Sequence, residues 1–88
     1  MVYQVDLKPS AYESLSKIPL PQRKRIGKRI DQLAENPRPR GVKKLSSDEE
    51  LYRIRVGEYR VIYQINDKAL LVLVVRIGKR GDIYRNLP

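Results

Sequence analysis

The stretch that most constrains the fold runs from Leu51 to Ile65 and reads LYRIRVGEYRVIYQI. Apolar residues alternate with polar or charged ones on both sides of Gly57, and a β-strand places alternate side chains on opposite faces. The pattern therefore predicts two strands joined by a tight turn at Gly57. The expected apolar face of this hairpin consists of Tyr52, Ile54, Val56, Tyr59, Val61, Tyr63 and Ile65.

Three arginines lie on the opposite face of the predicted hairpin. Arg53 and Arg55 belong to its first strand and Arg60 to its second. A guanidinium remains charged at physiological pH, and like charges that face each other across a sheet are destabilising. Because the cluster does not help the sheet to fold, it indicates an anion-binding surface.

A helical hairpin is predicted ahead of these strands. Ser10 is suited to cap the first helix, which ends before Pro19 because a residue that precedes proline avoids the α region. The second helix is expected over Pro21–Glu35. Both carry apolar residues at the three- and four-residue spacing of a half-buried helix, namely Ala11, Leu15 and Ile18, then Ile26, Ile30, Leu33 and Ala34.

Two further strands are expected, Val2–Leu7 and Ala69–Ile77. The second is apolar on both faces, which is typical of a central strand that is covered on both sides, and the period of two places Arg76 on the face of Val74. Arg38–Glu50 is expected to be a polar connection. The order β, α, α, β, β, β predicts an α+β domain over residues 1–88, with the helical hairpin on one face of a mainly antiparallel sheet of about four strands.

The composition limits the partners and the reactive groups that this chain can have. The chain carries 19 Lys and Arg against 10 Asp and Glu, a net charge of +9, which favours a nucleic-acid partner over a membrane surface. It has no cysteine and no histidine, so thiolate chemistry and the commonest general base and metal ligand are excluded. The carboxylates show no paired arrangement, and neither a metal nor a cofactor is expected. Without a signal peptide or a membrane-length apolar run, the expected location is the cytoplasm.

Other basic residues extend the predicted nucleic-acid surface. The run on the second helix has two interpretations, a solvated helix face or a surface that binds phosphates. Lys79 and Arg80 lie in a loop between two glycines that permits close approach to a ligand. Tyr84 follows and is either a base-stacking or proton-positioning group or a terminal plug of the core. The candidate RNA-binding residues are Arg23, Lys24, Arg25, Lys28, Arg29, Lys43, Lys44 and Lys79.

Taken in order, these blocks resemble toxins of the RelE/ParE superfamily, on the RelE side. The resemblance spans nearly the whole chain and includes ENPRP after the second helix, the Lys44-Leu45 pair, LYRIR followed by YRVIYQ, and RIGKR followed by a tyrosine. It implies a RelE-like fold in which the first strand lies beside the last. It also implies a ribosome-dependent endoribonuclease that uses 2′-hydroxyl attack to cleave mRNA in the A site of the ribosome.

The resemblance further implies a RelB-like antitoxin as partner, with operator DNA bound only through the antitoxin complex. The family's catalytic positions fall on Arg53, Arg55, Arg60, Arg80 and Tyr84. Two of them that are often lysine in the family are arginine here, at 53 and 55. Since arginine does not act as a base, the expected mechanism rests on positioning and electrostatic stabilisation of the phosphate.

Two other functions fit the sequence. One is a ParE-like poison of DNA gyrase, which shares the fold but does not require the arginine face or the Arg80 and Tyr84 ending. The other is a non-catalytic nucleic-acid-binding or corepressor module, which predicts salt-dependent binding without cleavage.

Overall fold

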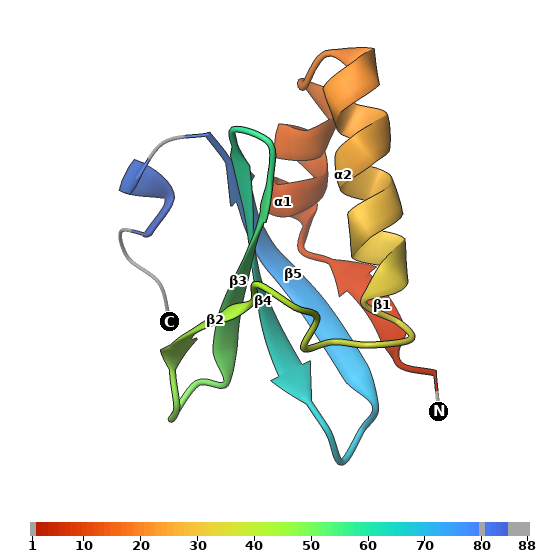
Figure 1. Ribbon diagram of the computed structural model, residues 1–88, viewed down its shortest axis with the longest axis vertical. Coiled ribbons are helices and arrows are strands. Elements are labelled where there is room, and N and C mark those ends of the chain that lie inside the picture. The colour runs from red at the N-terminus through yellow and green to blue at the C-terminus, as the bar shows by residue number, and fades with distance from the viewer. Residues whose placement is uncertain (1, 80, 85–88) are drawn as a thin grey trace.

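A five-stranded sheet carries two helices on one face in the computed structural model, which describes residues 2–79 and 81–84 (Figure 1). The sheet order is β1-β5-β4-β3-β2, with β1 parallel to β5 and the other pairs antiparallel. The expected α+β architecture and the placing of the first strand beside the last are therefore confirmed. The strands are β1 (Gln4–Leu7), β2 (Lys43–Ser46), β3 (Leu51–Val56), β4 (Tyr59–Asn66) and β5 (Leu71–Gly78).

The sheet has one strand more than the sequence predicted. Part of the expected connection Arg38–Glu50 forms β2, which pairs with β3 and places Lys43 opposite Arg53 and Lys44 opposite Tyr52. This strand is only four residues long, lies at the sheet edge and carries lysines on both faces. Short, lysine-bearing strands are common at sheet edges because they discourage pairing with other chains. Residues 43–46 lack the alternation of apolar and polar side chains that identifies a half-buried strand, so the sequence pattern did not predict β2.

Helices α1 (Pro9–Ser16) and α2 (Leu20–Gln32) cover one face of the sheet (Figure 1). The capping role predicted for Ser10 is wrong: α1 begins at Pro9, whose fixed φ suits the first helical position, and Lys8 precedes it without a side-chain cap. The second helix ends at Gln32, three residues before the predicted Glu35. Neither helix is long and apolar enough to cross a membrane, within the described residues.

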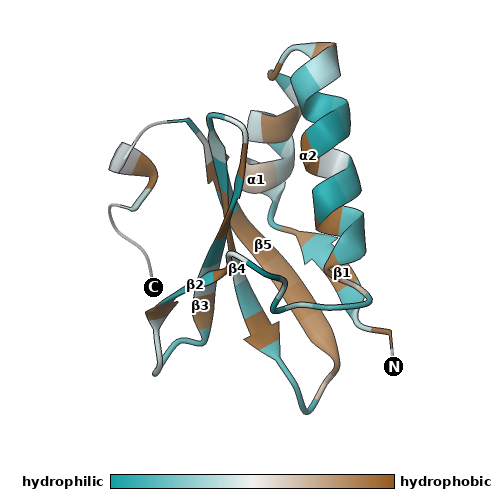
Figure 2. Cartoon of the chain, viewed as in Figure 1, coloured by the Kyte–Doolittle hydropathy of each residue, from teal (hydrophilic) through white to brown (hydrophobic). Residues whose placement is uncertain are grey.

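Apolar side chains are buried on both faces of the sheet. The larger cluster lies between helices and sheet and includes Ile26, Ile30, Tyr63 and Val74. β5 is apolar from Leu71 to Val75, whereas α2 is hydrophilic outside its buried stripe (Figure 2). The expectation of a central strand covered on both sides is thereby confirmed. The smaller cluster, on the other face, consists of Leu51, Ile62 and Val75, with Leu45, Leu73, Ile83 and Tyr84 packed against it.

A β-bulge in β5 changes the face on which its last residues lie. Tyr63 pairs with Val74, but the next residue of β4, Ile62, pairs with Arg76, so Val75 is the extra residue. The prediction that Arg76 shares the face of Val74 is therefore wrong. Because directly paired residues share a face, Arg76 lies on the same side as Ile62, and its Nη1 donates a hydrogen bond of 2.9 Å to the carbonyl oxygen of Ile83.

Polar contacts fix the connection that follows α2. The buried hydroxyl of Tyr63 donates to the carbonyl oxygen of Pro37 at 2.7 Å. Arg38 donates two hydrogen bonds to the carboxylate of Asp67, at 3.1 and 2.9 Å, and the hydroxyl of Tyr3 donates a third at 2.6 Å. The residue before β1, the connection after α2 and the β4–β5 turn are thus held together by these contacts.

Candidate active site

An open pocket of about 380 Å³, referred to below as the arginine pocket, lies on the sheet face that the helices leave uncovered. It brings together four of the five predicted catalytic residues from three elements of the fold. Its lining residues are Lys43 and Leu45 of β2, Arg53 and Arg55 of β3, Arg60 of β4, and Tyr84 of the 3-10 helix η1 (Gly81–Tyr84). The fifth, Arg80, lies outside the described residues.

Strand pairing aligns the cations of this pocket. Arg55 is the direct cross-strand partner of Arg60, and Arg53 is the partner of Lys43. Each pair juxtaposes two positive charges, an arrangement that weakens a sheet. An anionic group bound between them would remove that repulsion, as the sequence pattern indicated.

Arg53 also has an unused hydrogen-bond donor. Its Nε is buried and finds no hydrogen-bond partner within the described part of the chain. Buried polar groups in proteins are nearly always paired because an unpaired one costs about 1–3 kcal/mol. A ligand in the open pocket would reach this buried nitrogen only after the side chain turns, so the unpaired Nε shows that the hydrogen bonding of Arg53 is incomplete in the free protein.

Arg60 is held in place by the neighbouring chain segment. Its Nη1 donates a 2.7 Å hydrogen bond to the carbonyl oxygen of Lys79, just beyond the end of β5. A guanidinium has five N–H donors in a rigid plane, so one anchoring bond leaves others directed to a ligand. The contact also ties the hairpin to the loop that carries Lys79.

Tyr84 reaches the pocket because η1 packs closely on β5. A Cβ atom built on Gly78 would overlap the side chain of Ile83, so only glycine permits this approach. Tyr84 is half-buried against the smaller apolar cluster and lines the pocket at the same time. Tyr84 therefore lies against the apolar cluster and in the wall of the pocket, and its chemical role stays a prediction.

The two lysines of β2 have different positions. Lys43 lines the pocket. Lys44 lies on the opposite face, where its Nζ is 3.2 Å from Oε2 of Glu50 and 5.6 Å from the ring centre of Tyr52. The hydrogen bond to Glu50 raises the pKa of Lys44. Of the two, only Lys43 is placed to contact a ligand in the pocket.

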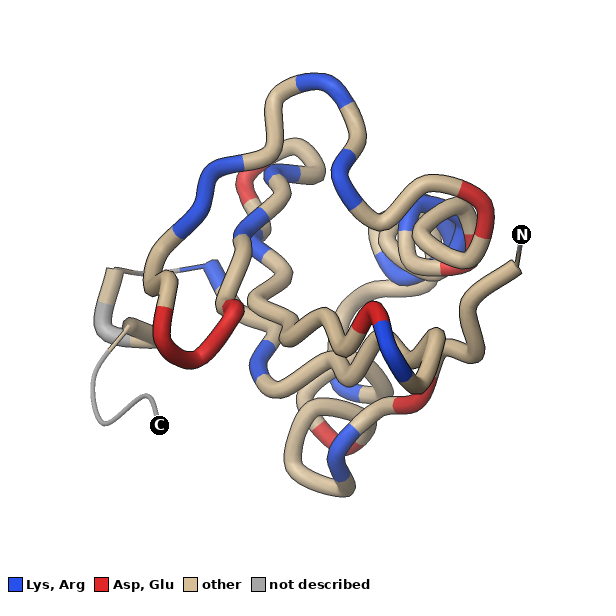
Figure 3. Tube along the Cα trace, turned by 90° about the horizontal axis from the view of Figure 1, so that it is seen from below, with Lys and Arg blue, Asp and Glu red and all other residues tan. Residues whose placement is uncertain are grey.

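The basic residues of α2 do not line this pocket. Figure 3 shows Lys and Arg positions along the coil of this helix. A separate pocket of about 300 Å³ at the tip of the hairpin is lined by Arg25, Lys28, Arg29, Gln32, Val56 and Gly57. Arg23 donates to the carbonyl oxygen of Ser16, and Lys24 is exposed. The helix therefore presents a cationic surface beside the hairpin tip rather than a part of the arginine pocket.

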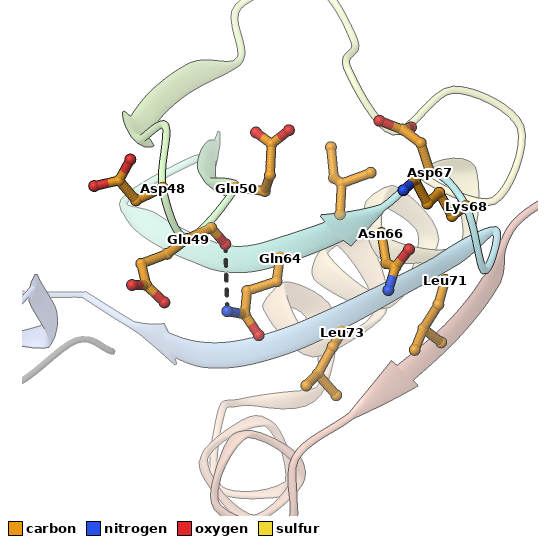
Figure 4. A pocket seen from close by; sticks show the side chains of 10 residues that line it. Asp48, Glu49, Glu50, Gln64, Asn66, Asp67, Lys68, Leu71 and Leu73 are labelled. Carbon is orange, nitrogen blue, oxygen red and sulfur yellow. Dashed lines mark hydrogen bonds between the residues drawn. The ribbon is translucent and has the colours of Figure 1, made fainter.

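A larger pocket, of about 490 Å³, lies elsewhere and is acidic (Figure 4). Asp48, Glu49, Glu50 and Asp67 line it with only Lys68 as a cation, and none of the predicted site residues takes part. Its charge disfavours a phosphate. Asp48, Glu49 and Glu50 do not line the arginine pocket, and Glu50 instead pairs with Lys44 and Tyr52.

Three residues near the arginines were not among the predicted site residues. Leu45 lines the arginine pocket, while Glu58 and Tyr59 line a neighbouring one with Arg55, Arg60 and Lys79. Recognition of β2 would have identified Leu45, because it lies two residues from Lys43 on the same face. The position of Glu58 follows from the hairpin turn, where Gly57 has a φ of +63°.

Comparisons with known proteins agree with this architecture. The family model described as ParE toxin of type II toxin-antitoxin system, parDE, matches residues 5–84. The mRNA interferase toxin RelE of Escherichia coli K12 is 29% identical over 88 residues, which cover 96% of this chain and 92% of that protein.

Solved structures give the same result. The archaeal RelE–RelB complex from Pyrococcus horikoshii OT3 contains a chain that is 32% identical and superposes with a TM-score of 0.83, covering 92% of this chain and 98% of that one. A chain of the intact Escherichia coli RelBE toxin–antitoxin complex superposes with a TM-score of 0.77 at 27% identity, covering 90% and 98%.

Proposed function

Because the chain belongs to the RelE/ParE superfamily of toxins from type II toxin–antitoxin systems, we propose that it is a ribosome-dependent endoribonuclease that cleaves mRNA in the A site. The observation that carries the proposal is the pocket in which Arg53, Arg55, Arg60 and Tyr84 meet. The gyrase-directed alternative does not require this constellation.

The proposed reaction is a phosphoryl transfer within the message. The 2′-hydroxyl oxygen attacks the adjacent phosphorus and loses its proton to water. The bond to the 5′-oxygen of the next nucleotide breaks and that oxygen takes a proton from water, so a 2′,3′-cyclic phosphate and a 5′-hydroxyl result. Preorganised cationic donors stabilise the negative charge on the phosphate oxygens and the leaving oxygen, and such stabilisation usually contributes most to the rate. Guanidinium groups supply that charge, so the proposed mechanism needs no metal.

Each residue then has a role. Arg53, Arg55 and Arg60, which line the pocket from the paired strands β3 and β4, hold the scissile phosphate. Tyr84 stacks on a base or orients the 2′-hydroxyl. Arg80, assigned by family resemblance, assists the leaving 5′-oxygen. Arginines do not accept a proton at neutral pH, so rate acceleration comes from orientation and charge stabilisation rather than from a general base.

The proposal implies specific partners. The cationic residues of α2 and Lys43 and Lys79 would bind phosphates of mRNA and ribosomal RNA, which adds affinity without sequence readout. A RelB-like antitoxin would inhibit the toxin, and operator DNA would be bound only through that complex. Action on ribosomes requires a cytoplasmic location.

Gyrase poisoning is the second candidate, and one observation favours it: the matching family model is described as a ParE toxin. A gyrase supercoiling assay run in parallel with ribosomal mRNA cleavage separates the two activities. A non-catalytic module would show salt-dependent nucleic-acid binding and neither activity.

The test is cleavage of mRNA on programmed ribosomes in vitro. We expect the wild-type protein to cut within the A-site codon. Arg53→Ala, Arg80→Ala and Tyr84→Phe should each slow cleavage on the order of 100- to 1,000-fold. Lys68→Ala, in the β4–β5 turn and away from the arginine pocket, serves as the control for loss of one positive charge. Wild-type rates in the Arg80→Ala and Tyr84→Phe variants would reject the assignment.

A further inference from the structure

A second open pocket, of about 330 Å³, adjoins the arginine pocket. Arg55 and Arg60 line both pockets, so this guanidinium pair forms the boundary between them. The other lining residues of the second pocket are Gly57, Glu58, Tyr59 and Lys79. A nucleic-acid chain bound in the arginine pocket can therefore extend into this second pocket.

Lys79 is held over the second pocket by three contacts. Its carbonyl oxygen accepts the 2.7 Å hydrogen bond from Arg60, its Nζ lies 5.7 Å from the ring centre of Tyr59, and the same Nζ lies 3.4 Å from Oε2 of Glu58. The side chains of the ion pair are 55% exposed for Lys79 and 80% exposed for Glu58. Such exposed ion pairs contribute little and exchange readily with solvent or other ions.

The charges of this pocket do not balance. Three cations, Arg55, Arg60 and Lys79, face the single carboxylate of Glu58. A carboxylate and a phosphodiester are both anionic oxygen acceptors, so a phosphate can take the place of Glu58 beside Lys79. The pocket would then exchange a weak internal partner for a ligand that all three cations bind.

We propose that this second pocket binds the RNA phosphate adjacent to the scissile one, and that Glu58 is a displaceable competitor that limits RNA affinity. The inference rests on the proposed ribonuclease function, because the first pocket must hold the scissile phosphate for the second to hold its neighbour. In the free protein Glu58 neutralises Lys79. When RNA binds, the phosphate displaces the carboxylate, which turns into solvent.

Binding of RNA that cannot be cleaved isolates this step from catalysis. The probe is a short fluorescent oligonucleotide with 2′-O-methyl groups at every position, followed by anisotropy over a series of salt concentrations. Glu58→Gln should tighten binding about two- to fivefold at low salt, the range expected for an exposed charge pair. Lys79→Gln should weaken binding and reduce the salt slope by about 0.7, the value for one phosphate contact with a single strand.

Matched controls separate the pocket from the overall charge of the protein. Glu13 forms an equivalent exposed pair with Lys17 on α1, at 3.3 Å, so Glu13→Gln removes the same charge elsewhere. Lys68→Gln is the corresponding control for Lys79→Gln. Glu58 is proposed to act through Lys79. In a protein that already carries Lys79→Gln, Glu58→Gln should therefore tighten RNA binding no more than Glu13→Gln does. The two substitutions in the pocket would then be non-additive in a double-mutant cycle.

Two results would overturn the proposal: equal effects of Glu58→Gln and Glu13→Gln, or additive effects of the Glu58 and Lys79 substitutions. Either would reduce Glu58 to a contributor to net charge. Cleavage on programmed ribosomes by the wild-type protein is measured separately. Absence of cleavage there would reject the ribonuclease function, whereas the anisotropy cycle tests the second pocket by itself.

Discussion

Arg55 and Arg60 lie directly opposite each other across the β3–β4 hairpin, and both line the two adjoining cationic pockets. Facing like charges destabilise a sheet. The hairpin therefore loses stability at the place where, in the proposed function, it binds a phosphate, a compromise that is common at functional sites.

This repulsion predicts opposite effects of one substitution on stability and activity. Arg55→Thr, which keeps a residue favourable to strands, should raise the free energy of unfolding by about 0.2–1 kcal/mol because it removes the facing charge. The same variant should lose most of its mRNA cleavage. Urea unfolding and ribosomal cleavage measure the two effects, and Lys68→Thr controls for net charge. A less stable Arg55→Thr protein would contradict this explanation.

Gly78 controls the approach of η1 to the sheet. Gly78→Ala should displace Ile83, whose side chain occupies the space that a Cβ would take, and with it Tyr84. We expect slower mRNA cleavage and a free energy of unfolding that is lower by about 1–3 kcal/mol, a decrease that is typical of overpacking. Gly81→Ala is the matched control, because a Cβ there meets no atom within 4 Å. Cleavage at the wild-type rate by Gly78→Ala would show that this packing does not position Tyr84.

The hydroxyl of Tyr63 links the core to the connection after α2. Burial raises the pKa of Tyr63, so the group remains a neutral donor to the carbonyl oxygen of Pro37. Tyr63→Phe leaves that buried oxygen unpaired and should lower the free energy of unfolding by about 1–3 kcal/mol. Chemical denaturation measures the change. Tyr12→Phe, at a side chain that is 66% exposed, should alter stability by less than about 0.5 kcal/mol.

The lowered pKa of the Asp67 carboxyl predicts that the protein loses stability in acid. Hydrogen bonds from Arg38, and then from Tyr3, lower the pKa of this carboxyl from 3.8 to about 2. The unfolded chain therefore takes up the proton first, so the stabilisation is fully present above about pH 4 and disappears as the pH falls through 2. Unfolding curves of wild type and Asp67→Asn should converge over that range.

The control for this pH dependence is Asp31→Asn, at an exposed carboxylate on α2. Its stability difference from wild type should change less between pH 5 and pH 2 than that of Asp67→Asn. A constant difference between wild type and Asp67→Asn over this range would contradict the proposed linkage.

The main features of the fold and most of the candidate site follow from local patterns. Alternation along Leu51–Ile65 predicted both strands and the common face of Arg53, Arg55 and Arg60, and the pairing of β3 with β4 agrees with it. The apolar spacing of α2 predicted the burial of Ile26 and Ile30. These predictions succeed because the period of a strand or helix is a property of the backbone itself.

Three features depended on the tertiary structure. β2 is recognised only by its pairing with β3, because its own four residues show no clear alternation. The bulge at Val75 reverses the face of Arg76, which a period of two cannot anticipate. The arginine pocket forms where the hairpin, β2 and η1 meet, and its neighbour forms where the hairpin meets Lys79.

The amino-acid sequence by itself determined the charge, the layers and the arginine face, since each depends on residue type and on the local backbone period. Only the tertiary structure decided which distant groups face those arginines: Tyr84 through the close packing of Ile83 on Gly78, Lys43 through an edge strand, and Lys79 through the hydrogen bond that its carbonyl oxygen accepts from Arg60. Residues that are distant in the chain meet there by packing, and no local pattern specifies such contacts.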